Sequence, residues 1–255
     1  MAIVQIIGNK GSKSRMEISK GTGIKLYLGN GKPDVIVNYG LHGPKLAQFF
    51  SRYPAAKKFP ILNRNVGCPK HITIHNVKKA GIPVPETRLT IPSISKISNW
   101  IEKRMQSSRG YGIRRASKRE HIPDKYYQRM VKNRIYELRV HAFSWLPVED
   151  WVLNKRIGPE SQIAWNFHQG GHFKSISSSD KSEVFRKAKD ISKKVLEIEG
   201  MAFGGVDFIV DKDKNIYFIE INSSPGFEKL NQGVYIEAFK KLKGLSVEKI
   251  KKYIQ

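Results

Sequence analysis

The 255-residue sequence has a single cysteine, few acidic residues and no long apolar run. Cys68 cannot form an internal disulfide, which agrees with a reducing compartment. No stretch approaches the roughly 18 uncharged apolar residues that a membrane-spanning helix needs. The N-terminus places a short apolar run before its basic residues, the reverse of the order in a secretory signal. We therefore expect a cytoplasmic protein without a membrane span.

The shortage of acids leaves a large positive charge. Lys and Arg number 46 against 22 Asp and Glu, which gives a net charge of +24. Such a charge attracts nucleic acid, nucleotides or an acidic protein surface. A general richness in lysine is the alternative explanation, because the basic residues are spread along the chain. The sequence also lacks a P-loop, a dinucleotide-binding fingerprint and a Ser-His-Asp arrangement.

Apolar patterns and turn residues predict three blocks, residues 1–66, 67–133 and 134–255. In the first block, AIVQII and DVIVNYG predict buried strands of a small α/β domain. Helical spacing in GPKLAQFFSRY and a short strand in FPILNRN follow. The stretch between residues 8 and 31 is so rich in turn residues that it predicts no element.

The second block opens with an amphipathic helix that Gly81 closes, and a strand follows. The third block begins with strands that run to His172. A helix then starts at a cap formed by Ser179 or Asp180 and stops at Gly200. A hairpin and a basic amphipathic tail helix complete the chain.

The hairpin joins VDFIV and IYFIEI through the turn-rich segment DKDKN. Residues two apart in a strand share a face, so Glu220 and Asn222 point the same way. If Asp207 lies on the neighbouring strand, two carboxylates and a carboxamide converge. These are hard oxygen ligands that suit magnesium, whereas zinc would need His or Cys. The alternative is a strand whose polar face is simply solvated.

The segment GVDFIVD…YFIEINSSPG resembles the metal-binding end of the ATP-grasp superfamily of carboxylate–amine ligases. HNVKKAGIPVPET is similar to the helix and strand that open its nucleotide domain, SSRGYGI to its glycine-rich loop, and ELRVHAF to the strand after the adenine pocket. WNFHQGG resembles the Asn-x-His-x-Gly-Gly loop of ribosomal protein glutamate ligases. These stretches occur in the family's order across residues 65–230, and parts of them also resemble small ATP-grasp proteins of bacteriophages, which would place the protein in a host cytoplasm.

The resemblance implies an ATP-grasp fold of class α/β (α+β), in which two α+β subdomains sandwich ATP and a small α/β domain precedes them. Residues 67–133 would form the N-terminal ATP-grasp subdomain with the glycine-rich loop. Residues 134–255 would form the C-terminal subdomain with the metal site and the tail helix. The small first block would contribute one wall of the acceptor site.

Ligases of this family phosphorylate a carboxylate with ATP, release ADP, and let an amine displace phosphate from the acyl phosphate. The resemblance implies two magnesium ions, with manganese as an alternative, held by Asp207, Glu220 and Asn222. It implies nucleotide contacts from cations and loop glycines, namely Lys70, Lys103 (with Arg104 as its alternative), Arg109, Gly110 and Gly112. It implies catalytic roles for Arg139, which would face the phosphates or the substrate carboxylate, and for Lys155 or its alternative Arg156, which would steady the transferring phosphoryl group. It implies substrate contacts for Asn166 and His168. Adenine would lie near residues 127–131.

Two positions depart from the glutamate ligases, which have Arg where Ala164 and Gln169 stand here. The resemblance therefore does not extend to residues that would select glutamate. An open site with a basic surface favours an acidic peptide or protein acceptor together with an amino acid. Two other functions remain open from the sequence: an ATP-grasp kinase that phosphorylates a hydroxyl, and a basic nucleic-acid-binding module without catalysis.

Overall fold

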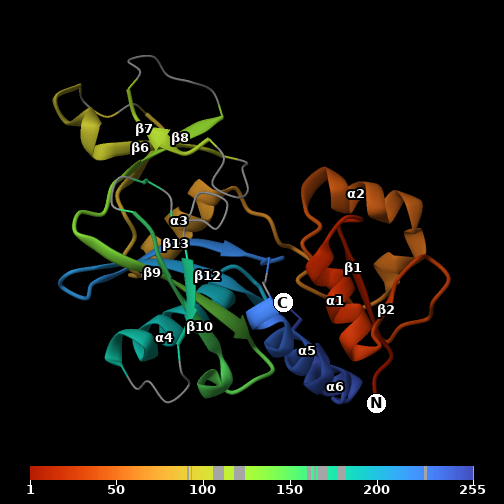
Figure 1. Ribbon diagram of the computed structural model, residues 1–255. Coiled ribbons are helices and arrows are strands. Elements are labelled where there is room, and N and C mark those ends of the chain that lie inside the picture. Colours follow the sequence, from red (N-terminus) through yellow and green to blue (C-terminus); the bar gives the residue numbers. More distant parts are fainter. Residues whose placement is uncertain are drawn as a thin grey trace.

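The computed structural model describes residues 1–90, 92, 94–105, 112–117, 124–159, 162–163, 165, 172–176, 182–226 and 229–254. These residues form three sheets, and each sheet is built within one of the three predicted blocks (Figure 1). The block boundaries themselves remain a prediction. In the described part of the chain, no helix is both long and apolar enough to cross a membrane.

The first sheet is parallel, with strand order β2-β1-β3-β4. Its strands are β1 (Val4–Gly8), β2 (Lys25–Leu26), β3 (Val35–Tyr39) and β4 (Ile61–Leu62). Helix α2 (Gly43–Arg52) and the 3-10 helix η1 (Pro54–Lys58) cover one face through an aromatic cluster. Helix α1 (Lys13–Thr22) covers the other face. The strands predicted from AIVQII, DVIVNYG and FPILNRN are confirmed.

Helix α1 lies in the turn-rich stretch for which the sequence predicted no element. The Ser12 side chain caps it by accepting a hydrogen bond from the Arg15 amide, and Gly23 ends it at φ +67°. Gly21 falls inside the helix because α5 packs closely there: a Cβ at Gly21 would lie 2.4 Å from the Ile236 side chain. Glycines that cap a helix or admit a neighbour resemble turn glycines in a sequence.

The second sheet is antiparallel, with order β5-β8-β6-β7. Its strands are β5 (Thr87–Arg88), β6 (Trp100–Arg104), β7 (Arg114–Arg115) and β8 (Lys125–Arg129), and the 3-10 helix η2 (Ile94–Asn99) precedes β6. Helix α3 (Lys70–Lys79) precedes the sheet and is closed, as predicted, by Gly81 at φ +79°. It contacts α4 and β13 of the third block.

The third sheet is antiparallel, with order β11-β10-β9-β12-β13. Its strands are β9 (Arg134–Phe143), β10 (Val152–Ile157), β11 (His172–Ser175), β12 (Phe203–Asp211) and β13 (Ile216–Asn222), with the short 3-10 helix η3 (Val148–Asp150) between β9 and β10. Helix α4 (Glu183–Ile198) packs one apolar face against β9, β12 and β13. The predicted hairpin and the stop at Gly200 are confirmed.

Two details of the helices differ from the sequence predictions. Helix α4 begins at Glu183 with Ser182 at the N-cap position, later than a cap at Ser179 or Asp180 would place it. The tail forms two helices, α5 (Lys229–Lys243) and α6 (Val247–Lys251), because the chain turns near Gly244 and Ser246 caps a new helix.

The first block and the third sheet share a hydrophobic core. It joins Ile6 and Ile18 of the first block to Phe143 and Phe203 of the third sheet and to Phe239 of α5. Asn63 strengthens this joint with its side chain, which accepts from the Ala202 amide at 2.7 Å and donates to the Phe203 carbonyl at 2.9 Å. At the edge of the joint, the Tyr39 hydroxyl donates to the Pro225 carbonyl at 2.8 Å.

We expect Asn63→Ala to lower the free energy of unfolding by about 2–3 kcal/mol, because it leaves a buried amide and a buried carbonyl without partners. Asn63 is 3% exposed and adopts φ +58°, which alanine tolerates less well than asparagine. Urea unfolding measures the loss. The exposed neighbour Asn65→Ala is the matched control, with an expected change below about 0.5 kcal/mol. Equal effects of the two substitutions would contradict this role.

Candidate active site

The face of the third sheet that lies opposite α4 carries a row of charged and polar side chains. On β9, Leu138 and Val140 point into the core beneath α4, so Glu137 and Arg139 point to the opposite face. Asp207 on β12 lies directly between two partners in the strand register, Arg139 on β9 and Glu220 on β13. The predicted neighbourhood of Asp207 and Glu220 is therefore confirmed.

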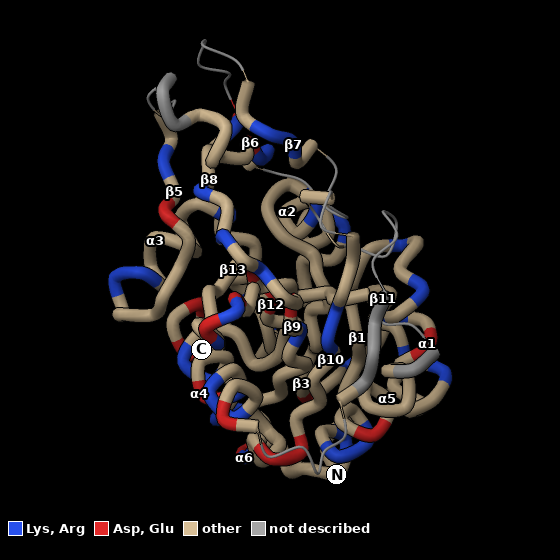
Figure 2. Tube along the Cα trace, turned by 60° about the vertical axis from the view of Figure 1, so that its left-hand side comes forward, with Lys and Arg blue, Asp and Glu red and all other residues tan. Residues whose placement is uncertain are grey.

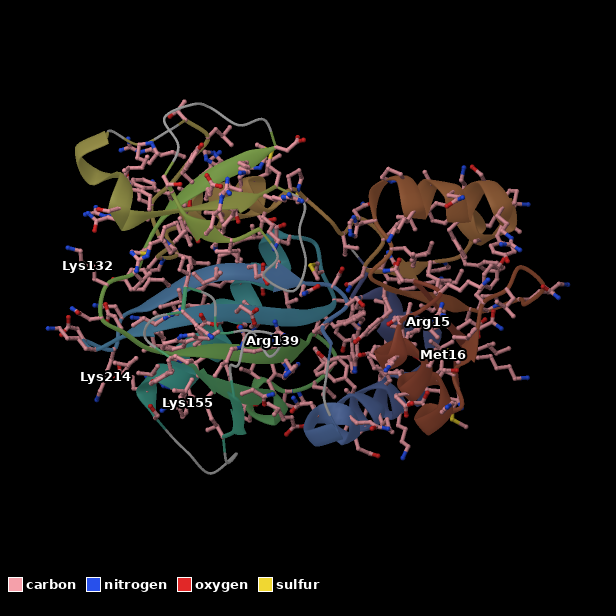
Figure 3. The ribbon with its side chains drawn as sticks, turned by 45° about the horizontal axis from the view of Figure 1, so that its top comes forward. Arg15, Met16, Lys132, Arg139, Lys155 and Lys214 are labelled. Carbon is pink, nitrogen blue, oxygen red and sulfur yellow. The ribbon has the colours of Figure 1, made fainter. Side chains whose placement is uncertain are left out.

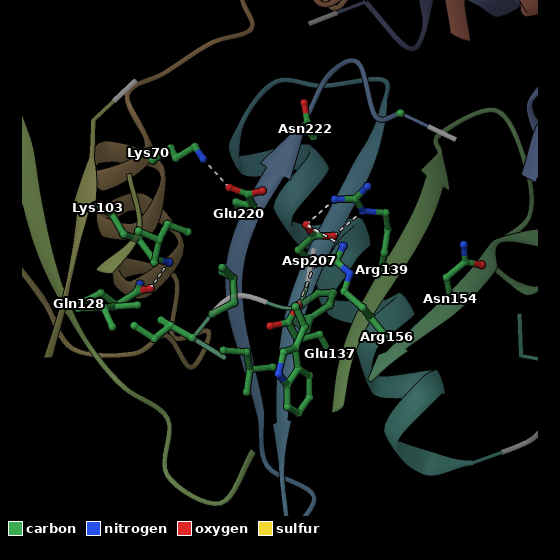
Figure 4. Close-up of a pocket in the computed structure, with 18 of the residues that line it drawn as sticks. Lys70, Lys103, Gln128, Glu137, Arg139, Asn154, Arg156, Asp207, Glu220 and Asn222 are labelled. Carbon is green, nitrogen blue, oxygen red and sulfur yellow. Dashed lines mark hydrogen bonds and ion pairs between the residues drawn. The ribbon is translucent and has the colours of Figure 1, made fainter. Parts of the chain in front are cut away.

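Two ion pairs hold these carboxylates (Figure 4). Arg139 binds Asp207 through two parallel hydrogen bonds of 2.6 Å, from Nε to Oδ1 and from a terminal nitrogen to Oδ2. Lys70, at the start of α3, lies 2.7 Å from Oε2 of Glu220. Asp207 is 7% exposed, whereas Glu220 is half-buried and Asn222 is exposed at the end of β13. Exposure to solvent therefore increases along the row from Asp207 through Glu220 to Asn222.

A further carboxylate, Glu137, lies beside this row with 14% of its side chain exposed. It accepts hydrogen bonds from Arg134 at 2.9 Å and from Arg156 at 2.8 Å. Arg156 also approaches Asp207 to 3.9 Å, so it connects the two carboxylates. Glu137 was not among the site residues predicted from the sequence. The spacing rule that linked Glu220 to Asn222 would have found it, because Glu137 is two residues before Arg139 on the same strand face.

Burial and the surrounding cations act in opposite directions on these groups. Burial alone would raise the pKa of the Asp207 carboxyl, but the guanidinium of Arg139, with Arg156 beyond it, outweighs burial and holds that pKa below its ordinary value. Burial prevails at Glu137, whose pKa is raised despite its two arginines. Burial, with Arg139 adding to its effect, lowers the pKa of His141 to about 3, so this histidine is neutral at physiological pH.

The second sheet forms the facing wall. Lys103 on β6 is buried and donates to Oε1 of Gln128 on β8 at 2.6 Å. Burial lowers the pKa of Lys103 to about 8. Met130 and Val131, which follow β8, line the same cleft, in the stretch predicted to lie near adenine. Gln128 lies in that same stretch, but its contact with Lys103 was not predicted, because the pairing of β6 with β8 cannot be read from either strand alone.

The cleft between these walls has a volume of about 1600 Å³ and is lined by all three blocks. The first block contributes the β1–α1 connection, residues 9–14, and the start of α2. Gly40, at the end of β3, meets the segment after β13 so closely that a Cβ would lie 2.3 Å from the Ser224 Cβ. Its φ of +85° also favours glycine. This contact places the first block beside Asn222.

The structure brings most of the predicted site residues into this cleft but not all of them. Those that line it are Lys70, Lys103, Arg139, Arg156, Asp207, Glu220 and Asn222. Lys155 lies on the other face of β10, with its ammonium 4.2 Å from the centre of the Tyr136 ring, away from Arg139 (Figure 3). Lys155 and Arg156 were alternatives for the residue that steadies the transferring phosphoryl group, and of the two Arg156 lies in the cleft.

The predicted glycine-rich loop is only partly described. Gly112 has φ +77°, and a Cβ there would lie 3.1 Å from the side chain of Arg104, the alternative to Lys103. Arg109, Gly110, Asn166 and His168 lie outside the described residues, as do Ala164 and Gln169. Their predicted roles stay predictions.

The donor set at the end of the hairpin fits a divalent cation of the magnesium type. Asp207 and Glu220 face each other in register on adjacent strands, and Asn222 is the next residue on the same face of β13. Within the described residues, no group of three or more His, Cys, Asp or Glu side chains is placed to hold a metal, so any such ion would depend on two carboxylates and a carboxamide. The oxygen-only set disfavours zinc.

Comparisons with known proteins agree with this architecture. A model of the ATP-grasp domain matches residues 69–226. A protein of Haemophilus influenzae named probable alpha-L-glutamate ligase is 30% identical over 172 residues, which cover 60% of this chain and 54% of that protein. A protein of the same name from Histophilus somni is 24% identical over 218 residues, covering 78% and 71%. The chain thus spans about half the length of the Haemophilus relative.

Solved structures with the same fold include ATP-grasp ligases. The ligase PsnB, complexed with a minimal precursor, has a TM-score of 0.65 at 14% identity, covering 94% of this chain and 100% of that one. D-alanine–D-alanine ligase from Bacillus anthracis, complexed with ATP, has a TM-score of 0.63 at 14% identity, covering 98% and 97%. At these identities the likeness shows the fold alone, and it confirms the predicted ATP-grasp fold.

We expect Asp207→Asn to lower the free energy of unfolding by about 3 kcal/mol near neutral pH, because it leaves Arg139 buried without a carboxylate. The folded-state pKa of Asp207 lies below its unfolded value. Its stabilisation is therefore fully present above an unfolded pKa of about 4 and is lost as the pH falls through the folded-state pKa. The difference in the free energy of unfolding between wild type and Asp207→Asn should therefore become smaller as the pH falls below about 4.

Urea unfolding of both proteins at about pH 7, 5 and 3 measures this difference. Asp213→Asn, in the exposed hairpin turn, is the control and should change little at any pH. A difference between wild type and Asp207→Asn that stays constant down to about pH 3 would contradict the coupling to Arg139.

Proposed function

The chain belongs to the ATP-grasp family, and from this membership we propose that it is an ATP-dependent carboxylate–amine ligase. The reaction would phosphorylate a carboxylate with ATP, release ADP, and form an amide when an amine displaces phosphate from the acyl phosphate. The observation that carries the proposal is the register of Asp207 opposite Glu220 and Arg139 in a cleft lined with cations.

The cations of the cleft match the charge of a nucleotide triphosphate. Lys70 and Lys103 lie on the side of the second block, and Arg139 and Arg156 on the third sheet. Since phosphoryl transfer relies mainly on positioning and on neutralising phosphate charge, these side chains would orient the phosphates and steady the transferring group. Gln128 and Glu137 fix the cationic ends of Lys103 and Arg156 by hydrogen bonds.

Asp207, Glu220 and Asn222 would hold magnesium, as two ions by family resemblance, and magnesium would supply neutralisation of the phosphate oxygens. In the structure Lys70 and Arg139 occupy the same carboxylates. We therefore expect these two cations to exchange carboxylate oxygens for phosphate oxygens when a nucleotide binds. This exchange keeps the buried carboxylates compensated in both states.

We propose an acidic peptide or protein as one substrate and an amino acid as the other. The open cleft, with a small first block on one side, leaves room for an extended chain. Solved structures with the same fold include the ligase PsnB complexed with the precursor peptide PsnA2, and the macrocyclase MdnC of Microcystis aeruginosa bound with the precursor peptide MdnA. The test is ATP consumption with magnesium against pooled amino acids and an acidic peptide library, followed by mass spectrometry of the products.

A peptide whose mass rises by an amino acid less water, together with ADP, would support the ligase and identify its substrate. A phosphorylated product would instead assign the site to a kinase. Absence of turnover together with absence of nucleotide binding would overturn an ATP-dependent function altogether.

We expect Glu220→Gln to lower ATP turnover by about 100-fold or more, because it removes a carboxylate charge from the proposed metal site without changing its shape. Glu237→Gln, on the exposed side of α5, is the matched control and should leave turnover unchanged. Steady-state ADP release measures both. Turnover like that of wild type in Glu220→Gln would exclude this site as the catalytic centre.

Neighbouring residues on β10 give a sharper comparison. We expect Arg156→Lys to lower kcat by about 10- to 100-fold, because lysine keeps the charge but loses the planar fork between Glu137 and Asp207. Lys155→Arg, on the opposite face of the strand, should change kcat by less than about threefold. The reverse order of effects would move the phosphoryl-steadying role to Lys155, and thermal melts check that both variants fold.

A further inference from the structure

The positive charge of the protein is distributed unevenly. Residues 1–133 contain 26 Lys and Arg against 6 Asp and Glu, whereas residues 134–255 contain 20 against 16 (Figure 2). Between Asp34 and Glu86 the chain has no acidic residue at all. Most of the net charge therefore lies on the first and second blocks, both of which line the cleft.

The cations of the first block have no carboxylate partners of their own. Residues 1–66 contain 11 Lys and Arg and only two acids, Glu17 and Asp34. Each acid binds a neutral group, Gln232 for Glu17 and the Ile3 amide for Asp34. Among the described residues, no salt bridge involves residues 1–66. This charge is left for an external anion to compensate.

The uncompensated cations follow a path out of the active-site cleft. The residues that line the cleft include Lys10 on the β1–α1 connection, Lys13 at the start of α1 and Lys45 in the first turn of α2. Lys45 and Arg52 are seven residues apart, so they share one face of α2 about 10 Å apart. Lys57 and Lys58 of η1 continue beyond the end of the helix, and all four of these α2 and η1 cations are exposed.

We propose that α2 and η1 form a docking surface for an acidic polypeptide segment, whose chain continues past Lys45 into the cleft. The inference rests on the proposed ligase function and names where its acceptor binds. The spacing between Lys45 and Arg52 corresponds to about one turn of an extended chain of the polyproline II type, which has three residues per turn, so a segment with an acidic residue at every third position matches it. The surface would bind the acidic side chains of the segment, while the reacting group of the same polypeptide would lie in the cleft.

The aromatic residues of this surface favour a peptide over a single-stranded nucleic acid. Phe49, Phe50 and Tyr53 are half-buried and packed against one another, with ring centres 5.2 to 5.7 Å apart along the cluster. The cationic groups of Lys57 and Arg64 lie over Phe50, at 6.0 and 5.6 Å, and Arg52 lies over Tyr53 at 5.4 Å. These cations cover part of the ring surface of Phe50 and Tyr53, which leaves less of it for the base stacking on which single-strand binding depends.

Binding of a labelled polyglutamate peptide, measured by fluorescence anisotropy at low and physiological salt, tests the proposal. The variant carries Arg52→Ser, Lys57→Ser and Lys58→Ser together. The control carries Lys20→Ser, Lys25→Ser and Lys32→Ser, which removes the same charge from exposed positions at the other end of the first sheet. A labelled single-stranded oligonucleotide serves as the competing probe.

We expect the α2–η1 variant to weaken peptide binding about tenfold and to reduce its salt dependence, and the control to stay within about twofold of wild type. The oligonucleotide should bind more weakly than the peptide at equal salt. Equal losses in both variants would overturn the proposal, because binding would then follow net charge alone. Tighter oligonucleotide binding through the same residues would overturn it in favour of a nucleic-acid surface.

The stabilisation of the protein by magnesium and ATP, read from thermal melts of all three proteins, separates this inference from the proposed function. Both variants should retain the wild-type thermal shift, since neither changes a residue that we assign to the nucleotide. No shift in any of the proteins would count against the ligase function. Peptide binding would still report on the docking surface alone.

Discussion

The pairing of Arg139 with Asp207 is the interaction on which the site depends. A carboxylate as buried as Asp207 stays ionised only if a cation compensates it, and Arg139 does so with two short parallel hydrogen bonds. The pair crosses from β9 to β12, at the centre of the third sheet. The pair therefore fixes the position of the Asp207 carboxylate relative to the core of the sheet before any ligand binds.

The other charges of the cleft are arranged around this pair. Arg156 reaches toward Asp207 while it binds Glu137, and Lys70 compensates Glu220 from the start of α3. Asp207, Glu137 and Glu220 thus each have at least one cationic partner. The same arrangement places several cations where the phosphates of a nucleotide would lie, so one set of side chains serves both the stability of the empty cleft and its affinity for polyanions.

Local rules of sequence predicted much of this arrangement. The two-residue period of a strand and the turn-rich DKDKN segment were enough to place Glu220 and Asn222 on one face and Asp207 beside them. The same period also predicts that Lys155 and Arg156 point to opposite faces, but not which of them faces the cleft, because that depends on how β10 pairs with β9. The contact of Lys103 with Gln128 likewise follows from pairing between strands that are distant in sequence.

Helix α1 could not be predicted for a different reason. Gly21 is unfavourable inside a helix unless another element needs the space, and that element, α5, is more than 200 residues away in the chain. The glycine inside α1 is explained only by its contact with α5. Tertiary packing, rather than local preference, decides the conformation of this stretch.

The core that the first block shares with the third sheet has a mechanical consequence. Because Phe143, Phe203 and Phe239 pack with Ile18 and Asn63 locks β4 to β12, these two parts behave as one body. The antiparallel second sheet has a small core around Trp100 and Tyr127, and Tyr126 of β8 joins it to the large core beneath α4. Any opening of the cleft that keeps the shared core intact therefore moves the second sheet relative to this body and displaces Tyr126 from the core beneath α4. The basic residues along α2 and the carboxylates of β12 and β13 keep their relative positions while the second sheet moves.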